Sequence, residues 1–222
     1  MVTLTVENYV KAIYQVCAES ESGTASNGDL AKRLGVAPGS VTSMLRTLAE
    51  SQLADYQSHK GVRLTDAGNK LALRVLRRHR LVELFLVQTL GLAWDEVHEE
   101  AEHLEHVVSE RLIDRMDEYL NFPERDPHGD PIPTSEGTVS DASRISLVDC
   151  PLGAKFQLDR VLDQSPEFLR YLGQAGLEFG STGTIEEKQE HAGALIVRTA
   201  TGAALLLGTH AAEKIRVTLA PR

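Results

Sequence analysis

The sequence predicts a chain that is mainly α-helical over its N-terminal two thirds and that ends in a small β-barrel. Three observations support this fold class. Apolar residues recur at helical spacing over most of residues 3–119. Four of the eight prolines then fall within residues 122–133, where a helix cannot continue. Beyond them, short apolar runs alternate with glycine-containing turns, a pattern typical of strands.

The N-terminal segment has the spacing of a helix-turn-helix. A helix is expected over residues 3–18, where apolar residues share one face. Ser26 is a suitable cap for a second helix over residues 27–34, and a third is expected to begin at Pro38 and to reach about Glu50. Two short helices joined by a glycine-containing turn of about four residues form the helix-turn-helix motif.

A short hairpin is expected after the third helix. Residues 53–57 and 62–64 have the composition of strands, and Gly61 lies at the turn between them. This hairpin would be the wing of a winged helix, and a further helix is expected to open at residues 65–68. The winged-helix domain is therefore predicted to comprise residues 1–73.

Small hydroxyl and basic residues of the third helix and the wing are candidates for contacts with DNA. Such side chains bind phosphates and base edges. The same residues are also compatible with the exposed surface of a winged helix that binds protein. The candidates are Pro38, Gly39, Ser40, Thr42, Ser43, Arg46, Lys60 and Arg63.

Two long amphipathic helices are expected next, over residues 69–90 and 95–119. They would form a second domain over residues 74–121. The proline-rich segment that follows is predicted to be a linker over residues 122–142, and residues 143–222 are predicted to form the barrel.

Histidines and carboxylates gather on one face of each long helix. On the first helix they are four residues apart, and on the second they span an arc of roughly 100°. If the helices pack antiparallel, these side chains converge, and imidazole with carboxylate suits divalent first-row metals. The alternative is a solvated acidic face, because charge runs are common on helices. The six residues are His79, Glu83, His98, Glu102, Glu105 and His106.

The net charge of −9 argues against a simple nucleic-acid binder unless the charge is unevenly distributed. Residues 1–73 carry seven basic and seven acidic residues, whereas residues 74–120 carry six and eleven. The acidity therefore lies outside the winged helix and is densest where histidines also gather. Bound cations would offset it.

The cytoplasm is the expected compartment. No apolar run approaches the ~20 residues of a membrane span, and the N-terminus lacks the pattern of a signal peptide. Cys17 and Cys150 provide no disulfide framework.

The C-terminal segment is expected to form short strands with one helical piece near residues 165–172. The expected strands cover residues 145–148, 156–161, 177–179, 184–187, 194–199, 203–207 and 215–219.

The joint order of several segments carries a resemblance that no single motif would. These segments are residues 9–14, the helix-turn-helix through Val41 and Thr42, and residues 64–68, 78–83, 97–106 and 126–133. In them the chain resembles the diphtheria toxin repressor family of iron- and manganese-dependent regulators, over essentially its whole length. The resemblance implies a winged helix, a dimerisation domain with metal sites, and a C-terminal SH3-like (FeoA-like) barrel.

The resemblance also implies two ligand sets. The principal metal site would comprise Glu102, Glu105, His106 and Asn8. A second site would comprise His79, Glu83 and His98, completed from the barrel by Gln164 and Glu167.

Two departures from the family pattern concern the metal. Iron-regulator members have Cys at the position of Glu102 and Met at that of Asn8, so the oxygen ligands here favour Mn²⁺ over Fe²⁺. Manganese-regulator members have carboxylates at the positions of Asn8 and Lys11. Because Lys11 cannot ligate a cation, a two-metal cluster of that kind is not expected.

The sequence thus predicts a homodimeric regulator that binds a palindromic operator when Mn²⁺ or Fe²⁺ is bound and that represses metal-uptake genes. Two alternatives are a metalloenzyme with a Glu/His site between helices and a metal-independent winged-helix regulator. The dimer interface is expected to use part of an apolar set on the long helices: Leu81, Leu84, Phe85, Val107, Val108, Leu112 and Ile113.

Overall fold

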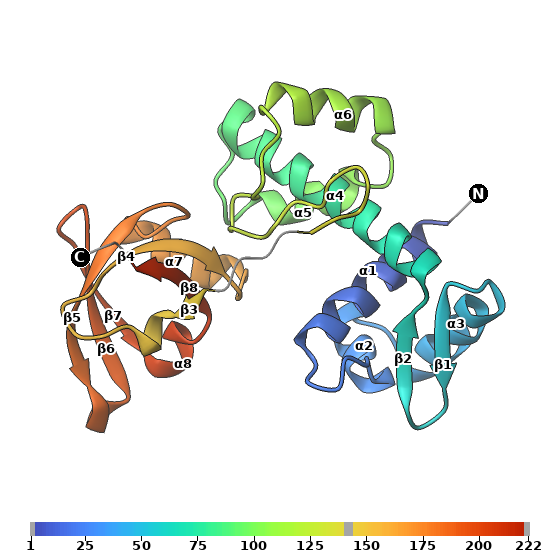
Figure 1. Ribbon diagram of the computed structural model, residues 1–222, viewed down its shortest axis with the longest axis horizontal. Helices are drawn as coiled ribbons and strands as arrows, with labels where there is room; N and C mark the ends of the chain where they lie inside the picture. The colour runs from blue at the N-terminus through green and yellow to red at the C-terminus, as the bar shows by residue number, and fades with distance from the viewer. Residues whose placement is uncertain (1–2, 140–143, 220–222) are drawn as a thin grey trace. The chain divides into compact units, whose positions relative to one another are not determined.

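The computed structural model describes residues 3–139 and 144–219, and the chain divides into two compact units. The first unit comprises the described residues up to 79, together with residues 103–109 and 133–138. The second comprises residues 80–102 and 110–132 and the described residues from 139 onward. Figure 1 labels the elements that belong to each.

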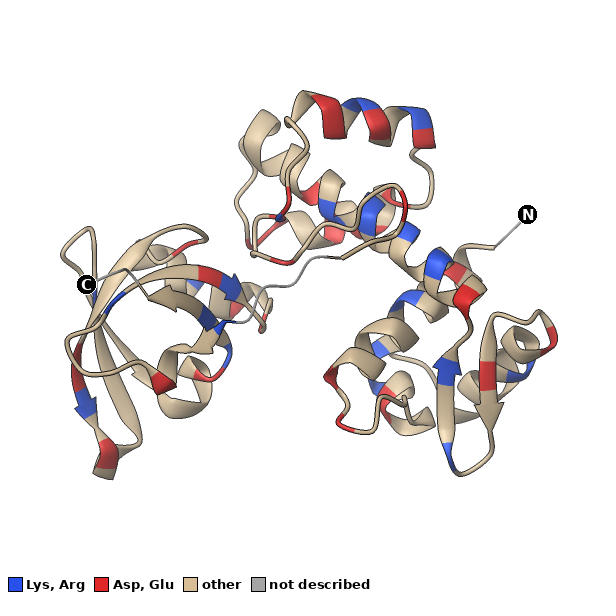
Figure 2. Cartoon of the chain, viewed as in Figure 1, with Lys and Arg blue, Asp and Glu red and all other residues tan. Residues whose placement is uncertain are grey.

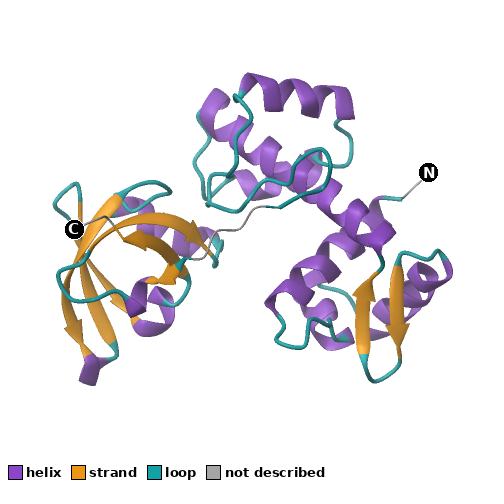
Figure 3. Cartoon of the chain, in the orientation of Figure 1, coloured by secondary structure: helices purple, strands orange, loops and turns teal. Residues whose placement is uncertain are grey.

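The first unit opens with three helices that begin and end at local signals in the sequence. Thr3 and Ser26 cap the first two helices by accepting hydrogen bonds from backbone N–H groups. Gly35 ends the second helix in the left-handed conformation, with φ 64°, and Pro38 begins the third. These helices are α1 (Leu4–Glu19), α2 (Asn27–Leu34) and α3 (Pro38–Glu50) (Figure 3).

A hairpin follows α3, so the predicted winged helix-turn-helix is confirmed. Strands β1 (Ala54–Gln57) and β2 (Gly61–Leu64) pair antiparallel, and the backbone of Ala25 pairs with Val62 of β2. Gly61 has φ 89°, and a Cβ there would lie 2.7 Å from the carbonyl oxygen of Ala25. Glycine is therefore required where the hairpin approaches the loop before α2.

The core of this unit is aliphatic. Apolar side chains of all three helices and of the hairpin pack into it, and full burial of a large aliphatic side chain contributes roughly 1.5–3 kcal/mol. The fully buried residues include Ile13, Leu30, Val41, Leu45 and Leu48.

Helix α4 (Asp66–Leu90) begins within residues 65–68, where a helix was expected to open, and continues without a break through the long helix expected over residues 69–90. The hydroxyl of Thr65 accepts a hydrogen bond from the backbone N–H of Gly68, which caps the first turn. The expected domain boundary between residues 73 and 74 therefore falls inside a helix.

The prediction of a single helix over residues 95–119 is wrong. The structure has α5 (Val97–Leu104) and α6 (Glu110–Tyr119), with a turn between them. The backbone N–H groups of Val107 and Val108 both donate to the carbonyl of Leu104, so the regular ladder ends there. Glu105 and His106 consequently lie beyond α5, not on its face as expected.

The proline-rich segment was expected to be a linker, and it contains neither helix nor strand. Its central residues are nevertheless buried, whereas those of a flexible linker would be exposed. One carboxylate oxygen of Asp126 accepts hydrogen bonds from the backbone N–H groups of His128 and Asp130, which closes a tight turn. Asp126 and His128 are 1% and 0% exposed. The segment is a folded part of the second unit up to Ile132.

The second unit contains a six-stranded antiparallel sheet with the order β3-β8-β4-β5-β6-β7. Among the described residues this order is open, with β3 and β7 at its ends. The strands are β3 (Ile145–Ser146), β4 (Lys155–Val161), β5 (Thr182–Gln189), β6 (Ala194–Thr199), β7 (Ala204–Gly208) and β8 (Ile215–Leu219).

One expected strand, over residues 177–179, is absent. Helix α7 (Pro166–Gln174) ends at a Schellman motif in which Gly176 has φ 70° and the N–H of Leu177 donates to the carbonyl of Leu172. Leu177 thus terminates a helix. A short helix, α8 (Thr209–Ala212), was not expected.

The apolar core of this unit joins the sheet to residues from outside it. Phe156 and Leu158 of β4 are buried in the same cluster as Trp94, which is 7% exposed. The Trp94 ring stacks on the imidazole of His128, with ring centroids 5.9 Å apart. No helix of the described residues is long and apolar enough to cross a membrane.

Candidate metal centres and nucleic-acid interface

Glu105 is the centre of a buried ionic cluster in the first unit. Its side chain is fully buried, and basic groups contact both of its oxygens. Nζ of Lys11 on α1 lies 2.6 Å from Oε1, and Nδ1 of His79 on α4 lies 2.5 Å from Oε2. Burial raises the pKa of Glu105, but the hydrogen bond to His79 and the charges of His79 and Lys11 outweigh burial and hold that pKa below its usual value.

His106 follows Glu105 and has two different environments at its ring nitrogens. Nδ1 lies 2.7 Å from Oε2 of Glu7 on α1, and Oε1 of Glu7 accepts a hydrogen bond from Arg78 on α4 at 3.2 Å. Nε2 is buried, has no hydrogen-bond partner among the described residues, and lies 3.3 Å from Oε1 of Glu105.

A second buried polar atom of this unit also lacks a hydrogen-bond partner within the described residues. It is Oδ1 of Asn8, on the turn of α1 that also carries Glu7 and Lys11. A buried acceptor with no donor costs free energy unless another group satisfies it. The structure thus provides two buried polar atoms without hydrogen-bond partners among the described residues, Asn8 Oδ1 and His106 Nε2, in the unit that holds the buried Glu105 carboxylate. This donor set fits a divalent cation.

The second unit contains the other expected ligands from the long helices. Nδ1 of His98 on α5 lies 3.3 Å from Oε1 of Glu83 on α4, and Nε2 of His98 lies 3.7 Å from Oε1 of Glu102. Glu83 is 1% exposed, whereas half of the His98 side chain is exposed. His79, four residues before Glu83 on α4, also offers a ligand atom within 4.8 Å of Glu83 and His98, as expected, and its Nδ1 contacts Glu105 as well.

Two buried residues beside Glu83 were missed as candidate ligands. Glu83, Asp126 and His128 each offer one atom within 4.8 Å of the other two. Nε2 of His128 bonds the carbonyl oxygen of Trp94 at 2.8 Å, while Nδ1 faces Glu83 Oε2 at 3.7 Å and has no hydrogen-bond partner in the described structure. The sequence does contain one signal for these ligands, because Asp126 and His128 are two residues apart. They lie in the proline-rich segment that was expected to be a linker.

Burial and neighbouring charges shift the pKa values of Asp126 and His128. Burial, together with the negative charges of Asp130 and Glu83, raises the pKa of Asp126 to about 7. Burial lowers the pKa of His128, but the nearby carboxylates of Glu83 and Asp126 outweigh burial and raise that pKa to about 9. Arg80 lies 3.7 Å from Asp126 Oδ2 and supplies a compensating positive charge.

The two ligands expected from the barrel occupy other positions. The side-chain amide of Gln164 donates to Oδ2 of Asp130 at 2.9 Å. Glu167 is exposed in the first turn of α7. Arg160 of β4 also forms an ion pair with Asp130.

The candidate DNA-contacting residues lie on α3 and on the hairpin. Pro38, Gly39, Ser40, Ser43 and Arg46 are exposed, whereas Val41, Leu45 and Leu48 of the same helix are buried. This helix therefore presents a polar surface to solvent. The one exception among the candidates on α3 is Thr42, which is half-buried.

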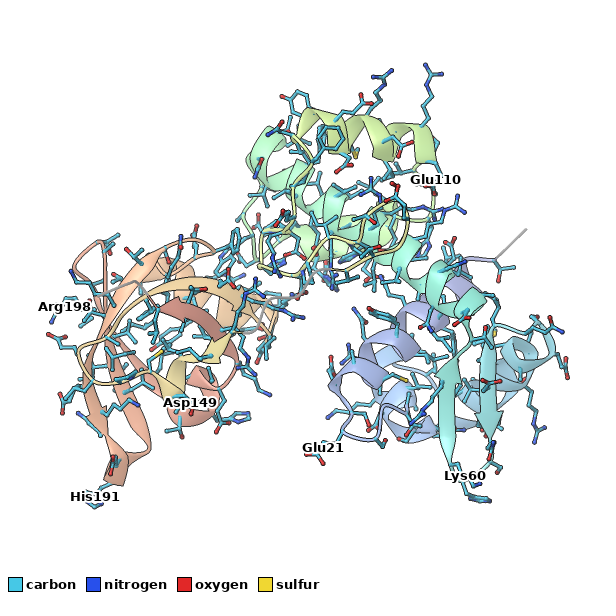
Figure 4. The ribbon with its side chains drawn as sticks, viewed as in Figure 1. Glu21, Lys60, Glu110, Asp149, His191 and Arg198 are labelled. Carbon is cyan, nitrogen blue, oxygen red and sulfur yellow. The ribbon has the colours of Figure 1, made fainter. Side chains whose placement is uncertain are left out.

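Thr42 has a structural role within the helix-turn-helix. Its hydroxyl accepts a hydrogen bond from the side-chain amide of Asn27 at 2.9 Å and donates to the carbonyl of Pro38 at 3.1 Å. These bonds join α2 to α3. On the hairpin, Lys60 is exposed at the tip (Figure 4), and Arg63 donates to the carbonyl of Ser22.

The apolar residues expected at a dimer interface differ in exposure, and Phe85 and Val108 are half-buried. Leu81, Leu84 and Ile113 are 0–5% exposed within this chain, so they belong to its own core and an interface would use other members of the set. Val107 and Leu112 are 76% and 47% exposed. Charged side chains of both signs accompany the apolar residues along α6 (Figure 2).

Family models match three consecutive segments of the chain. Residues 1–62 match the iron dependent repressor N-terminal DNA binding domain, and residues 65–134 match the iron dependent repressor metal binding and dimerisation domain. Residues 145–219 match the FeoA domain.

Similar proteins have names that agree with these matches. The diphtheria toxin repressor of Corynebacterium glutamicum is 30% identical over 223 residues, which cover 96% of this chain and 95% of that protein. The iron-dependent repressor IdeR of Mycobacterium tuberculosis is 34% identical over 157 residues, covering 68% and 67% respectively. A solved structure of a manganese-dependent transcriptional repressor in complex with manganese is 41% identical, with a TM-score of 0.87, and covers 97% of this chain and 100% of that one.

Proposed function

Because this chain belongs to the diphtheria toxin repressor family of metal-dependent transcriptional repressors, we propose that it binds operator DNA as a homodimer when Mn²⁺ is bound. Its relatives are repressors, not enzymes, so the metalloenzyme alternative is not favoured. The regulated genes are proposed to be those of metal uptake, and the compartment is the cytoplasm, where the DNA partner lies.

The principal metal is proposed to be held by Glu105 and His106 together with Asn8 and Glu102. The single observation that supports this proposal is the pair of buried polar atoms without hydrogen-bond partners among the described residues, Asn8 Oδ1 and His106 Nε2, in the unit that contains Glu105. A cation would satisfy both acceptors and would balance carboxylate charge. Asn8 belongs to α1 of the winged helix, so it is the residue through which metal binding would bias the DNA-binding domain.

Mn²⁺ is favoured over Fe²⁺ by the chemistry of the ligands. Carboxylate, amide oxygen and imidazole are hard or borderline donors, and neither cysteine belongs to the proposed set. Cys17 is only half-buried but bonds the carbonyl oxygen of Val62, and Cys150 is buried among the strands of the sheet. The manganese complex of a 41% identical repressor supports the same choice.

A second cation is proposed at Glu83, with His128 and Asp126. All three side chains are buried, and Nδ1 of His128 faces Glu83 at 3.7 Å. Because the pKa of His128 is raised to about 9, a cation bound here would displace a proton from its imidazole. This set is favoured over one completed by Gln164 and Glu167, because Gln164 already bonds Asp130 and Glu167 is exposed.

The DNA interface is proposed to be the exposed polar face of α3, with the hairpin as the wing. Arg46 would contact base edges, whereas Lys60 would contact phosphates. The neutral charge of residues 1–73 is compatible with this role, because the excess of acidic residues lies elsewhere in the chain.

The deciding experiment measures DNA affinity as a function of metal. Operator fragments would be selected from random duplexes with the full-length protein in Mn²⁺, and their affinity would then be measured in excess Mn²⁺ and in chelator. Tight binding only with metal supports the proposal. Equal affinity in both conditions would instead indicate a metal-independent regulator, and Mn²⁺ binding without any selected DNA would return the metalloenzyme alternative.

A further inference from the structure

Glu7 contacts a proposed metal ligand without being free to bind the metal. Its Oε2 lies 2.7 Å from Nδ1 of His106, and its Oε1 accepts from Nη1 of Arg78 at 3.2 Å. We propose that Glu7 is a positioning residue that fixes His106 in the tautomer with the proton on Nδ1 and the lone pair on Nε2. This inference rests on the proposed metal site and adds the group that prepares its imidazole.

The direction of the hydrogen bond follows from the chemistry of the two groups. An ionised carboxylate can only accept, so Nδ1 of His106 must be the donor to Glu7. A neutral imidazole carries one proton, and Nε2 is then the acceptor. Nε2 is the nitrogen that is buried without a hydrogen-bond partner among the described residues and that lies 3.3 Å from a Glu105 oxygen. The tautomer therefore directs the lone pair to the proposed ligand position.

Arg78 determines which oxygen of Glu7 faces His106. A guanidinium has only donors, so the Glu7 atom that faces Arg78 must be an acceptor. The side chains of Arg78 and Glu7 are 10% and 12% exposed, which restricts the rotation of the carboxylate. Arg78 on α4 thus holds Glu7 on α1 while Glu7 orients His106. Groups that orient metal-ligating histidines typically change metal affinity by about 10–100-fold when they are removed.

The isosteric variant Glu7→Gln tests the proposal because Arg78 dictates how glutamine must lie. The amide oxygen has to face Arg78, so the NH₂ group faces Nδ1 of His106 and donates to it. Nδ1 then becomes an acceptor, and the proton moves to Nε2. We expect ¹H–¹⁵N NMR of the chelator-treated protein to show Nδ1–H in the parent and Nε2–H in Glu7→Gln. Calorimetry should show Mn²⁺ affinity weaker by about 10–100-fold.

A second variant separates this effect from a loss of packing. In Glu7→Gln combined with Arg78→Met, the amide is free to rotate and accept from Nδ1, so the tautomer and much of the Mn²⁺ affinity should return. Arg78→Met alone should keep the proton on Nδ1. Glu21→Gln, at an exposed position, is the matched control for the amide substitution and should change neither measurement. Circular dichroism confirms that each variant folds.

The outcomes distinguish a failure of the positioning role of Glu7 from a failure of the proposed metal site. An Nε2–H signal with weakened affinity in Glu7→Gln, and rescue in the double variant, supports the proposal. An unchanged tautomer, unchanged Mn²⁺ affinity, or a double variant without rescue overturns it. If the parent protein binds no Mn²⁺ at all, the proposed function fails, while the tautomer measured in chelator still decides the role of Glu7.

Discussion

Lys11 and Glu105 form a buried ion pair, with Nζ 2.6 Å from Oε1, although 94 residues separate them in the chain. The Lys11 side chain is 8% exposed and that of Glu105 is fully buried. Charges removed from water in this way need a partner. Lys11 therefore supplies a fixed positive charge beside the proposed principal metal site, which supports the proposal of one bound cation at Glu105 instead of a two-metal cluster.

Replacing Lys11 with methionine keeps the packing but leaves the Glu105 carboxylate with less compensation. We expect a loss of about 3 kcal/mol in the free energy of unfolding in chelator. The loss should be smaller in excess Mn²⁺, because the cation offsets the same carboxylate. Urea unfolding in both conditions measures the difference, with Lys60→Met at the exposed hairpin tip as the control. Equal losses in chelator and Mn²⁺ would place Lys11 outside the influence of the metal.

Replacing Asn8 with alanine removes the proposed ligand of the winged helix. We expect Mn²⁺ affinity to fall only modestly, because the remaining ligands stay in place, while operator binding becomes insensitive to Mn²⁺. Glu105→Ala should reduce both measurements. Calorimetry for the metal and fluorescence anisotropy for the selected DNA separate the two quantities. Normal metal dependence of operator binding in Asn8→Ala would mean that α1 is not the link between metal and DNA.

Replacing Glu102 with cysteine changes the preference among metals. A thiolate is a softer ligand than a carboxylate, so the response should shift from Mn²⁺ towards Fe²⁺, Co²⁺ or Zn²⁺. DNA binding measured across a series of these ions gives the preference as a ratio of half-saturating concentrations. The ratio of the Mn²⁺ value to the Co²⁺ value should rise in the variant. If it does not, Glu102 is not a ligand.

Two variants of α3 distinguish DNA contact from internal support. Arg46→Ala should weaken operator binding by about 1–3 kcal/mol and leave stability unchanged, because Arg46 is exposed. Thr42→Val should lower the free energy of unfolding by about 1 kcal/mol, because the hydroxyl bonds Asn27 and Pro38. Anisotropy and urea unfolding on both proteins test this division of roles. The opposite pattern would show that the two side chains exchange these roles.

Replacing Leu112 with glutamate tests the dimer surface. Leu112 is 47% exposed in this chain, so the substitution should leave the subunit folded but convert a dimer into a monomer. Light scattering at micromolar concentration with Mn²⁺ measures the mass. Arg111→Glu, an exposed neighbour on α6, controls for added negative charge. A dimer that survives Leu112→Glu would move the interface to another surface.

The winged helix was predictable because its signals are local. Ser26, Gly35 and Pro38 each act within a few residues of their own position, through a cap, a left-handed turn and a helix start. The end of α7 was equally local, since Gly176 followed by apolar Leu177 is the sequence of a Schellman motif. The apolar composition of residues 177–179 predicts a strand, but Gly176 before them favours the end of a helix, and the structure has the helix end.

The sequence predicted which residues belong to the candidate site but not which of them contact one another. Their helical spacing identified Glu105, His106 and His79, but not that Glu105 leaves the helix to meet Lys11 and His79. Contacts between residues far apart in the chain decide that position. His128 was missed for a related reason, because nothing in its neighbouring residues shows that this segment is buried.

Trp94, the one tryptophan of the chain, gives the protein a built-in optical probe. Its indole is shielded from water and lies against the imidazole of His128, so its emission reports the packing of the second unit. Far-ultraviolet dichroism, in contrast, is dominated by helices, including those of the first unit. Denaturation curves followed by the two signals coincide only if the units unfold together. A single unlabelled sample can therefore reveal whether Mn²⁺ makes the two units one cooperative system.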